Sequence, residues 1–329
     1  MRPPIDTALT RRLVDAQFPQ WVGLPLERVE PGGSDHVIHR LGTELAVRMP
    51  RHPGPLGGLD REFAWLPRLA PHLPLAVPVP VAQGRPGFGY PWPWSVSRWL
   101  DGETADAGKL GDDAAVAGEL AEFLRALWDF GRIHRPAPGP AAVPPPEPLA
   151  DRDRATRAAI AQAADAFDAE AMTEVWDAAL AAEPWNRPPV WVHGDFHTGN
   201  LLTAGGRLDA VIDFSGLAFG DPATDLMMAY SLMTAPSRAV FRTALGVDDA
   251  TWARGRGWGL TGGLIAYAAY AHESPGIAAV TTRQIRAVLE DLAAYPAMGR
   301  GARDRSRVID VPWVSRDPER VLDANHPQP

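Results

Sequence analysis

The sequence predicts an α+β protein of two lobes, a small antiparallel β-sheet lobe followed by a larger, mostly helical lobe. The chain has 329 residues, which is more than a single hydrophobic core usually supports. Short apolar runs separated by Gly-containing turns fill the first part of the chain, whereas helical periodicity dominates after about residue 112. We therefore expect residues 1–100 to form the first lobe and residues 101–329 the second.

The first lobe is expected to open with a helix and to continue as a sheet. Residues 6–18 carry apolar side chains near helical spacing, and Asp6 or Thr7 can cap that helix. Strands are expected over residues 26–29, 36–41, 45–49 and 94–100, and the main helix of the lobe over residues 60–69. Pro residues block a helix over residues 77–81, so this segment is expected to be extended.

The second lobe is expected to be helical around a short β segment. Amphipathic periodicity predicts a helix over residues 113–130, and further helices are expected over residues 153–182 and 221–295. A strand is predicted at residues 190–192, and a hairpin at residues 201–202 and 208–212, turned by Gly205 and Gly206. The Pro-rich residues 136–148 are expected to form an extended connection on the surface. The tail after Gly299 is expected to wrap around the surface of the protein.

The composition narrows the classes of function. The chain has no Cys, which excludes a disulfide framework and thiol catalysis. No apolar run reaches the ~20 residues that cross a bilayer, and no signal sequence is recognisable, so we expect a cytoplasmic protein, monomeric or homodimeric. The net charge of −8 argues weakly against nucleic acid and is compatible with a cationic small substrate.

One segment carries the chemistry. His193–Asn200 reads H-G-D-F-H-T-G-N, and Asp213 follows it at the end of an apolar run. An Asp, an Asn after four intervening residues and a later Asp are the arrangement of kinase-like phosphoryl transfer, in which one carboxylate accepts a hydroxyl proton and the other two groups hold magnesium. Asp195 is therefore the candidate catalytic base, and Asn200 and Asp213 are the candidate Mg²⁺ ligands.

With Gly194 in place of the Arg of the protein-kinase motif H-R-D-x-x-x-x-N, this segment resembles the aminoglycoside phosphotransferase family. Gly220–Leu226, G-D-P-A-T-D-L, resembles the G-D-P-x-x-D-L segment of that family. The resemblance runs from about Pro31 to about Ala229. It implies a bilobal, protein-kinase-like fold whose first lobe binds nucleotide and whose second lobe holds the catalytic loop and the acceptor site.

The resemblance also implies nucleotide ligands in the first lobe. The turn Pro31–Asp35 contains the candidate phosphate-covering residues Gly32, Gly33 and Ser34, because backbone N–H groups of a Gly turn can approach phosphate closely.

A cation on the third strand, paired with a Glu on the next helix, holds the phosphates in kinase-like folds. Arg48 and Glu62 stand at these places, with Arg51 competing for the role of Arg48. The base is expected against residues 97–100, where Ser97 and Trp99 can present main-chain groups. ATP and GTP are not distinguishable.

The remaining residues around the motif receive structural roles. His193 is expected to brace the loop by hydrogen bonding, Asp221 to cap the helix that starts near Pro222, and Asp225 to brace the catalytic loop. His197 receives no role beyond that of a loop residue.

The acceptor is expected to be a small molecule with a hydroxyl group. By family resemblance, an antibiotic such as an aminoglycoside is the leading candidate; a metabolite, or a macrolide, peptide or nucleoside antibiotic, is the alternative. The end of the helix expected over residues 249–273 offers Tyr270 to stack on a ring and Glu273 to bind an amino group. A nucleotide-binding module without transfer, and a metal-dependent hydrolase using His193, Asp195 and His197, are the rival functions.

Overall fold

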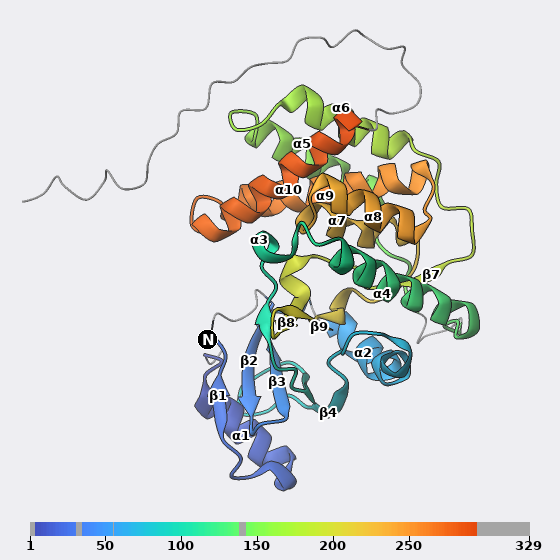
Figure 1. Cartoon of the computed structure of the whole chain (residues 1–329). Helices are drawn as coiled ribbons and strands as arrows, with labels where there is room; N and C mark the ends of the chain where they lie inside the picture. Colours follow the sequence, from blue (N-terminus) through green and yellow to red (C-terminus); the bar gives the residue numbers. More distant parts are fainter. Residues whose placement is uncertain (1–3, 31–34, 55, 138–142, 295–329) are drawn as a thin grey trace, which may run out of the picture. The chain divides into compact units, whose positions relative to one another are not determined.

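The computed structural model describes residues 4–30, 35–54, 56–137 and 143–294 (Figure 1). Their elements follow the α+β order expected from the sequence, with strands first and helices later. None of the helices in these ranges is long and apolar enough to cross a membrane. The lobe boundary at residue 100 falls between two strands and stays a prediction.

A five-stranded antiparallel sheet dominates the first part of the chain, with the strand order β1-β2-β3-β5-β4. The elements of this part are α1 (Thr7–Gln17), β1 (Leu26–Arg28), β2 (His36–Leu41), β3 (Leu45–Pro50), α2 (Leu56–Leu69), β4 (Pro80–Gly84) and β5 (Trp94–Arg98). The strands expected from the sequence are confirmed to within two residues at most ends, although pairing of the extended Pro segment begins only at Pro80.

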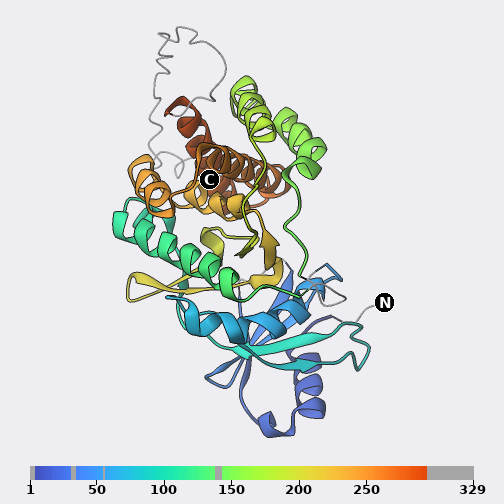
Figure 2. The same cartoon turned by 90° about the vertical axis from the view of Figure 1, so that its right-hand side faces the viewer.

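The two helices of this part lie on opposite faces of the sheet (Figure 2). On β2, alternate residues such as Val37 and Leu41 join the hydrophobic core that α1 covers. On β3, Arg48 points to the other face, where its guanidinium meets Glu62 of α2. The sheet therefore separates a hydrophobic core on the α1 side from a charged pair on the α2 side.

Helix α2 starts at Leu56, four residues before the start expected from the sequence. Gly57 and Gly58 lie in the first helical turn of α2. In the sequence, two adjacent Gly residues indicate a reverse turn and not the start of a helix. A Cβ on Gly58 would lie 2.6 Å from the carbonyl oxygen of Ser215. The early start is thus a packing requirement, since only Gly lets the helix approach the segment that follows Asp213.

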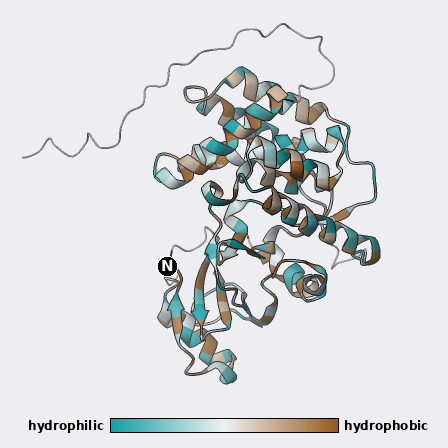
Figure 3. Ribbon diagram, viewed as in Figure 1, coloured by the Kyte–Doolittle hydropathy of each residue, from teal (hydrophilic) through white to brown (hydrophobic). Residues whose placement is uncertain are grey.

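Helices make up most of the second part of the chain. They are α3 (Ala107–Leu110), α4 (Ala114–Ile133), α5 (Asp153–Gln162), α6 (Ala169–Ala181), α7 (Met228–Ser231), α8 (Ala235–Leu245), α9 (Asp249–Tyr270) and α10 (Pro275–Ala294). Helix α4 carries both apolar and polar residues along its length (Figure 3). Its buried stripe, which includes Leu120, Phe123 and Leu127, joins the larger hydrophobic core.

Helix α9 is packed on several sides at once. Its contacts include α6, α10 and the 3₁₀ segment Pro222–Met227. Small residues make this possible: a Cβ on Gly255 would lie 2.5 Å from Leu226, and one on Gly259 would lie 2.6 Å from Tyr230. The sequence predicted this helix, and its aromatic side chains differ in burial: Trp252 is buried, Trp258 and Tyr267 are half-buried, and Tyr270 is exposed.

Two short sheets lie within the helical part. The strands are β6 (Glu103–Thr104), β7 (Val190–Val192), β8 (Leu201–Ala204), β9 (Arg207–Val211) and β10 (Ala218–Gly220). The predicted β8–β9 hairpin is confirmed, and β6 extends it, while β10 pairs with β7. The hairpin begins at the end of the H-G-D segment and ends shortly before Asp213, so it fixes the relation between these two pieces of chain.

The buried His39 predicts a pH dependence of stability. This side chain lies in the core with both ring nitrogens unpartnered among the described residues, and burial, followed by the charge of Arg28, lowers its pKa from 6.5 to about 4. The folded protein therefore holds His39 neutral while the unfolded chain binds a proton. The free energy of unfolding should fall as pH drops from 6.5 to 4, by up to about 3 kcal/mol.

His39→Leu should remove this share of the pH dependence and raise the stability at pH 5, since an apolar side chain needs no partner there. Urea denaturation at several pH values measures both effects. His272→Leu, at an exposed position, serves as the control and should leave the slope unchanged. An unchanged slope in His39→Leu would show that other groups carry the dependence.

Candidate active site

The catalytic loop, His193–Asn200, runs from β7 to β8 and contains a position that only Gly can fill. Gly194 has a φ of +84°, and a Cβ there would collide with the carbonyl oxygen of Gly216. The Gly that replaces the kinase Arg is therefore required by the close approach of two backbone segments, the catalytic loop and the segment after Asp213.

Asp225 holds the start of the loop through backbone hydrogen bonds. Its two carboxylate oxygens accept from the N–H groups of His193 and Gly194 at 2.8 and 2.9 Å. Burial raises the pKa of Asp225 to about 7, and the two N–H donors act against this rise. The bracing role predicted for Asp225 is confirmed, and so is the capping role of Asp221, which accepts from Ala223 N–H at 3.0 Å.

His193 is fully buried and uses both ring nitrogens within the loop region. Its Nε2 lies 3.0 Å from the carbonyl oxygen of Ile212, and its Nδ1 lies 3.3 Å from the N–H of Asp195. The predicted bracing role of His193 is confirmed. A hydrolase site would need this imidazole as a metal ligand, which these contacts do not leave free.

Asp195 presents a half-exposed carboxylate at the centre of the loop. Its Oδ2 lies 3.2 Å from Nδ2 of Asn200 and 3.5 Å from Nε2 of His197. The Nδ1 of His197 accepts from Gly199 N–H at 3.0 Å, so Nε2 is the nitrogen that carries the proton towards Asp195. Burial acts to raise the pKa of Asp195, but the interactions with His197, its hydrogen bond first, act against burial, and the pKa of Asp195 is lowered.

Asn200 and Asp213 lie at the same end of the β8–β9 hairpin. Leu201 pairs with Val211 in the hairpin register, and the N–H of Ile212 donates to the carbonyl of Asn200 at 2.9 Å. Because Nδ2 of Asn200 donates to the carbonyl oxygen of Asp195 at 2.9 Å, its Oδ1 is left as an acceptor. The structure thus brings the three motif residues together at the open end of this hairpin, Asp195 and Asn200 before β8 and Asp213 after β9.

Asp213 adopts an unusual backbone conformation, with φ 61° and ψ 71°. Its side chain accepts from Ser215 N–H, which starts the 3₁₀ turn Phe214–Gly216. A non-Gly residue in the left-handed region is uncommon and tends to occur at functional sites, where the surrounding structure holds it in place.

Arg48 joins two acidic side chains from distant segments. Its NH1 lies 2.8 Å from Glu62 Oε2 and its NH2 lies 3.0 Å from Asp213 Oδ1. Burial acts to lower the pKa of Arg48, but the charges of Glu62 and Asp213 outweigh it and raise that pKa. Arg51, the competing cation, lies beyond the end of β3 and is exposed, so Arg48 is the one that meets the helix Glu.

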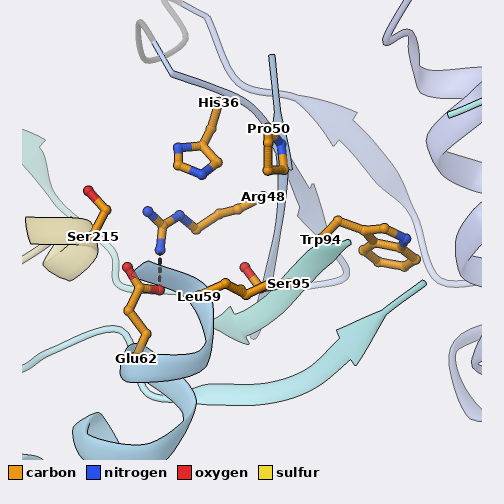
Figure 4. Close-up of a pocket in the computed structure, with 8 residues that line it drawn as sticks. All are labelled: His36, Arg48, Pro50, Leu59, Glu62, Trp94, Ser95 and Ser215. Atoms are coloured by element: carbon orange, nitrogen blue, oxygen red, sulfur yellow. Dashed lines mark hydrogen bonds and ion pairs between the residues drawn. The ribbon is translucent and has the colours of Figure 1, made fainter. Parts of the chain in front are cut away.

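A small cavity adjoins this pair (Figure 4). Arg48 lies between His36 of β2 and Glu62 of α2, and Ser215 reaches the same cavity from the segment after Asp213. The sequence did not point to His36 or Ser215, since a His that opens a strand and a Ser after a magnesium Asp have no distinguishing spacing. Arg61 was also missed; its guanidinium donates to the Ser215 carbonyl at 2.8 Å.

Ser97 lies on β5, an inner strand of the sheet, and Trp99 follows directly after this strand; their main-chain role towards a base stays a prediction. The N–H of Trp99 already donates to the Glu44 carbonyl at 2.8 Å, and its indole donates to Asp101. Ser97 is buried, with a hydroxyl oxygen that has no partner among the described residues, and it pairs with Ala46 on the strand that carries Arg48. The hydroxyl is therefore a candidate contact for a base.

The remaining candidate residues belong to the segment after β1 and to the end of α9. Gly32, Gly33 and Ser34 lie outside the described residues. Tyr270 is 49% exposed at the end of α9, and its carbonyl accepts from the N–H of Glu273, which closes the turn before α10. Within residues 143–294, no hydrogen bond or ion pair joins either side chain to the catalytic loop.

The fold and the site define a kinase-like phosphotransferase. A sequence model of the phosphotransferase enzyme family (APH) matches residues 25–258, so the chain belongs to this family. The predicted resemblance to the aminoglycoside phosphotransferases is confirmed, and the protein is an enzyme that transfers phosphoryl groups to hydroxyl groups. None of the curated proteins compared with the chain matches it.

Solved structures of the same fold cover nearly the whole chain. The GDP complex of aminoglycoside 2'-phosphotransferase-IIIa is 19% identical, with a TM-score of 0.66 over 87% of this chain and 99% of that one. Macrolide 2'-phosphotransferase MphH from Brachybacterium faecium is 23% identical, with a TM-score of 0.53 over 90% and 100%. Choline kinase from Cryptosporidium parvum Iowa II is 13% identical, with a TM-score of 0.58 over 89% and 98%.

Asp225→Asn should destabilise the protein and slow the enzyme. An amide offers one acceptor oxygen, so the N–H of either His193 or Gly194 loses its buried partner, at a cost of about 1–3 kcal/mol. Urea denaturation measures this cost. Asp168→Asn, at the N-cap of α6, is the matched control, because Asn caps helices as well as Asp does. Equal stability of the two variants would remove Asp225 from its bracing role.

Proposed function

We propose that this protein is a Mg²⁺-dependent kinase that transfers the γ-phosphoryl group of ATP or GTP to a hydroxyl of a small molecule. The observation that carries the proposal is the convergence of Asp195, Asn200 and Asp213 at one end of the β8–β9 hairpin, beside the buried pair of Arg48 and Glu62. Phosphoryl transfer asks the protein mainly for positioning and for charge stabilisation, and these groups supply both.

Asp195 orients the acceptor hydroxyl and takes its proton late in the transfer, when the phosphoryl group is nearly free. The lowered pKa of this carboxylate, maintained by His197 against the effect of burial, keeps it ionised at neutral pH. Its half-exposed position leaves an open side for a substrate.

Asn200 and Asp213 fit a magnesium ion. One offers an amide oxygen and the other a carboxylate, which are the hard oxygen ligands that Mg²⁺ prefers. The ion would supply charge neutralisation between the β- and γ-phosphates. The left-handed backbone of Asp213 and the hairpin register hold these two side chains at their places.

Arg48 and Ser97 are the proposed nucleotide contacts of the sheet. A guanidinium can bind phosphate oxygens with two parallel hydrogen bonds, and Glu62 fixes the direction of Arg48. The Ser97 hydroxyl can donate to or accept from a purine, so it serves adenine and guanine alike. Gly32, Gly33 and Ser34 remain the proposed cover for the phosphates.

The acceptor is proposed as an antibiotic such as an aminoglycoside, with a metabolite or a macrolide, peptide or nucleoside antibiotic as the alternative. The structures that share the fold include complexes with kanamycin and with gentamicin, a macrolide 2'-phosphotransferase and a choline kinase, and this range supports both the leading acceptor and the alternatives. For a polyamine-like acceptor, Glu273 and Tyr270 are the proposed contacts. A nucleotide-binding module without transfer is disfavoured, because the three motif residues are intact and assembled.

The cell compartment follows from the donor: we propose a cytoplasmic enzyme, monomeric or homodimeric, because nucleoside triphosphates are abundant in the cytoplasm. A panel of hydroxylated antibiotics and metabolites, incubated with Mg²⁺ and ATP or GTP, tests the proposal. Acceptor-dependent nucleotide consumption with a product heavier by one phosphoryl group is the expected result. A panel without any such product in the wild-type protein would contradict it.

Asp195→Ala should lower kcat by roughly a thousandfold while nucleotide affinity stays nearly unchanged, because the variant loses the positioning group and keeps the phosphate-binding groups. Steady-state kinetics and a separate nucleotide titration measure the two quantities. Turnover near the wild-type value would remove Asp195 from the mechanism.

Asp213→Asn and Asn200→Ala should differ in their response to magnesium. The first removes a charge from the metal site, whereas the second removes a neutral oxygen. Raising the Mg²⁺ concentration should restore transfer by Asn200→Ala more readily than transfer by Asp213→Asn. The reverse ranking in a Mg²⁺ titration would overturn the assignment of these two ligands.

A further inference from the structure

A groove of about 580 Å³ lies between α8 and α10 in the helical part of the chain. Its lining combines small apolar side chains with charged ones. These residues are Met233, Thr234, Ala235, Arg238, Ala278, Ala279, Thr282, Arg283, Arg286, Ala287 and Glu290. The groove is large enough for part of a small-molecule ligand, and none of its lining residues belongs to the catalytic loop or to the pair of Arg48 and Glu62.

The charges on the groove wall are mostly positive, which is unexpected in a chain of net charge −8. Three guanidinium groups, those of Arg238, Arg283 and Arg286, face one carboxylate, that of Glu290. Arg238 lies 3.6 Å from Glu290, so this single acid can neutralise one of the three. The lining therefore carries an excess of two positive charges.

Acidic residues behind the lining do not remove this excess. The buried Asp291 lies 3.8 Å from Arg238, but it also lies 3.4 Å from the buried Arg256. Asp106, which acts on Arg283 from the α3 side, lies 3.9 Å from Lys109. Each acid that reaches the groove from a neighbouring element thus has a further cation beside it.

The three cations differ in how they are held. Arg238 is 3% exposed, donates to the Met233 carbonyl at 3.0 Å, and has a buried Nε without a hydrogen bond within the described part of the chain. Arg283 donates to the carbonyls of Ser231 and Leu232. Burial, and after it the charge of Arg238, lowers the pKa of Arg283, as expected for cations crowded together.

Arg286 is exposed and makes no hydrogen bond or ion pair with the residues that the structure describes. Two fixed guanidinium groups and one unengaged one are a suitable receptor for an oxyanion, since Arg binds carboxylate and phosphate with parallel hydrogen bonds.

The groove is connected to the catalytic loop through Ser231. The Oγ of Ser231 accepts hydrogen bonds from the N–H and the hydroxyl of Thr198, at 3.2 and 3.1 Å. Thr198 belongs to the loop that carries Asp195, and the groove lining begins two residues after Ser231 at Met233. The chain that lines the groove at Met233 therefore continues directly from the residue that supports the loop.

We propose that this groove is the part of the acceptor site that binds an oxyanion, a carboxylate or a phosphate, of the small molecule whose hydroxyl is phosphorylated. The inference rests on the proposed function and favours an anionic metabolite among the proposed acceptors. A lining of this charge repels a polycationic antibiotic and attracts an anionic metabolite. Arg286 and Arg283 are the contacts of the oxyanion, and Glu290 opposes its binding.

Measurements of ligand binding test the groove independently of catalytic turnover. The full-length protein is saturated with Mg²⁺ and a non-hydrolysable nucleotide, so that the nucleotide site is filled. Glycerol 3-phosphate and glycerate are then titrated by calorimetry or ligand-detected NMR, with glycerol as the uncharged control. We expect both anions to bind more tightly than glycerol, and the tighter of the two identifies phosphate or carboxylate as the group.

Variants of the lining give effects of opposite sign. Arg286→Gln should weaken anion binding about tenfold, because a charge-assisted hydrogen bond is lost, and Arg283→Gln should act in the same direction. Glu290→Gln should strengthen binding, a gain that misfolding would not produce. Arg132→Gln, at an exposed position on α4, should change nothing. Equal anion affinity in wild type, Arg286→Gln and Glu290→Gln would overturn the proposal.

Turnover tests whether the groove belongs to the acceptor site. Hydroxy acids and sugar phosphates are compared with their neutral esters or parent sugars, and with aminoglycosides. We expect anionic acceptors to be preferred, and Arg286→Gln to raise their KM about tenfold while the KM of the nucleotide is unchanged. Efficient phosphorylation of a cationic or neutral acceptor, insensitive to Arg286→Gln, would overturn the groove proposal and leave the proposed kinase intact. If no compound is phosphorylated, the kinase proposal fails. The binding titrations alone then decide whether the groove binds an oxyanion.

Discussion

The bridge that Arg48 makes between Glu62 and Asp213 is the interaction on which the site depends. It joins β3, α2 and the segment after β9, which are far apart in the sequence. Taking a guanidinium out of water is costly, and two carboxylates repay the cost only if both are held in place. The packing of Gly58 and Arg61 against Ser215 serves this purpose, since it fixes α2 to the segment that carries Asp213.

A second constraint acts within the helical part, where the catalytic loop is held through its backbone groups. Asp225 accepts from two N–H groups of the loop, and Gly194 lies against the carbonyl of Gly216. The loop and the segment after Asp213 therefore behave as one backbone unit. Asp195, Asn200 and Asp213 extend from this unit, so their separation is set by the main chain.

Much of this site could be predicted from the sequence because its chemistry is local. Asp195 and Asn200 belong to one loop, and Asp213 follows a hairpin whose turn was readable from Gly205 and Gly206. The pair of Arg48 and Glu62 followed from the order of strand and helix. The start of α2 was misjudged, because the glycines of its first turn look like a turn until Ser215, which is far away in the sequence, is brought against Gly58.

Features that depend on contacts between distant segments were beyond sequence reasoning for the same reason. The hydrogen bonds of Thr198 with Ser231, and the gathering of Arg238 and Arg283 on one groove, join residues with no shared periodicity or spacing. His197 received no role because the proton on its Nε2 is defined only by the fold of its own loop.

The main-chain support of the loop has a consequence for how such enzymes diversify. Substitutions on α8 and α10 can reshape a binding surface without moving the reactive groups, because the approach of Gly194 to Gly216 and the grip of Asp225 do not pass through those helices. With the groove as the proposed binding surface for the acceptor, single substitutions on α8 and α10 would change the acceptor while Asp195, Asn200 and Asp213 keep their places. Mutagenesis that aims to change the acceptor of this enzyme is therefore best confined to the surface of α8 and α10, and the catalytic loop is best left unchanged.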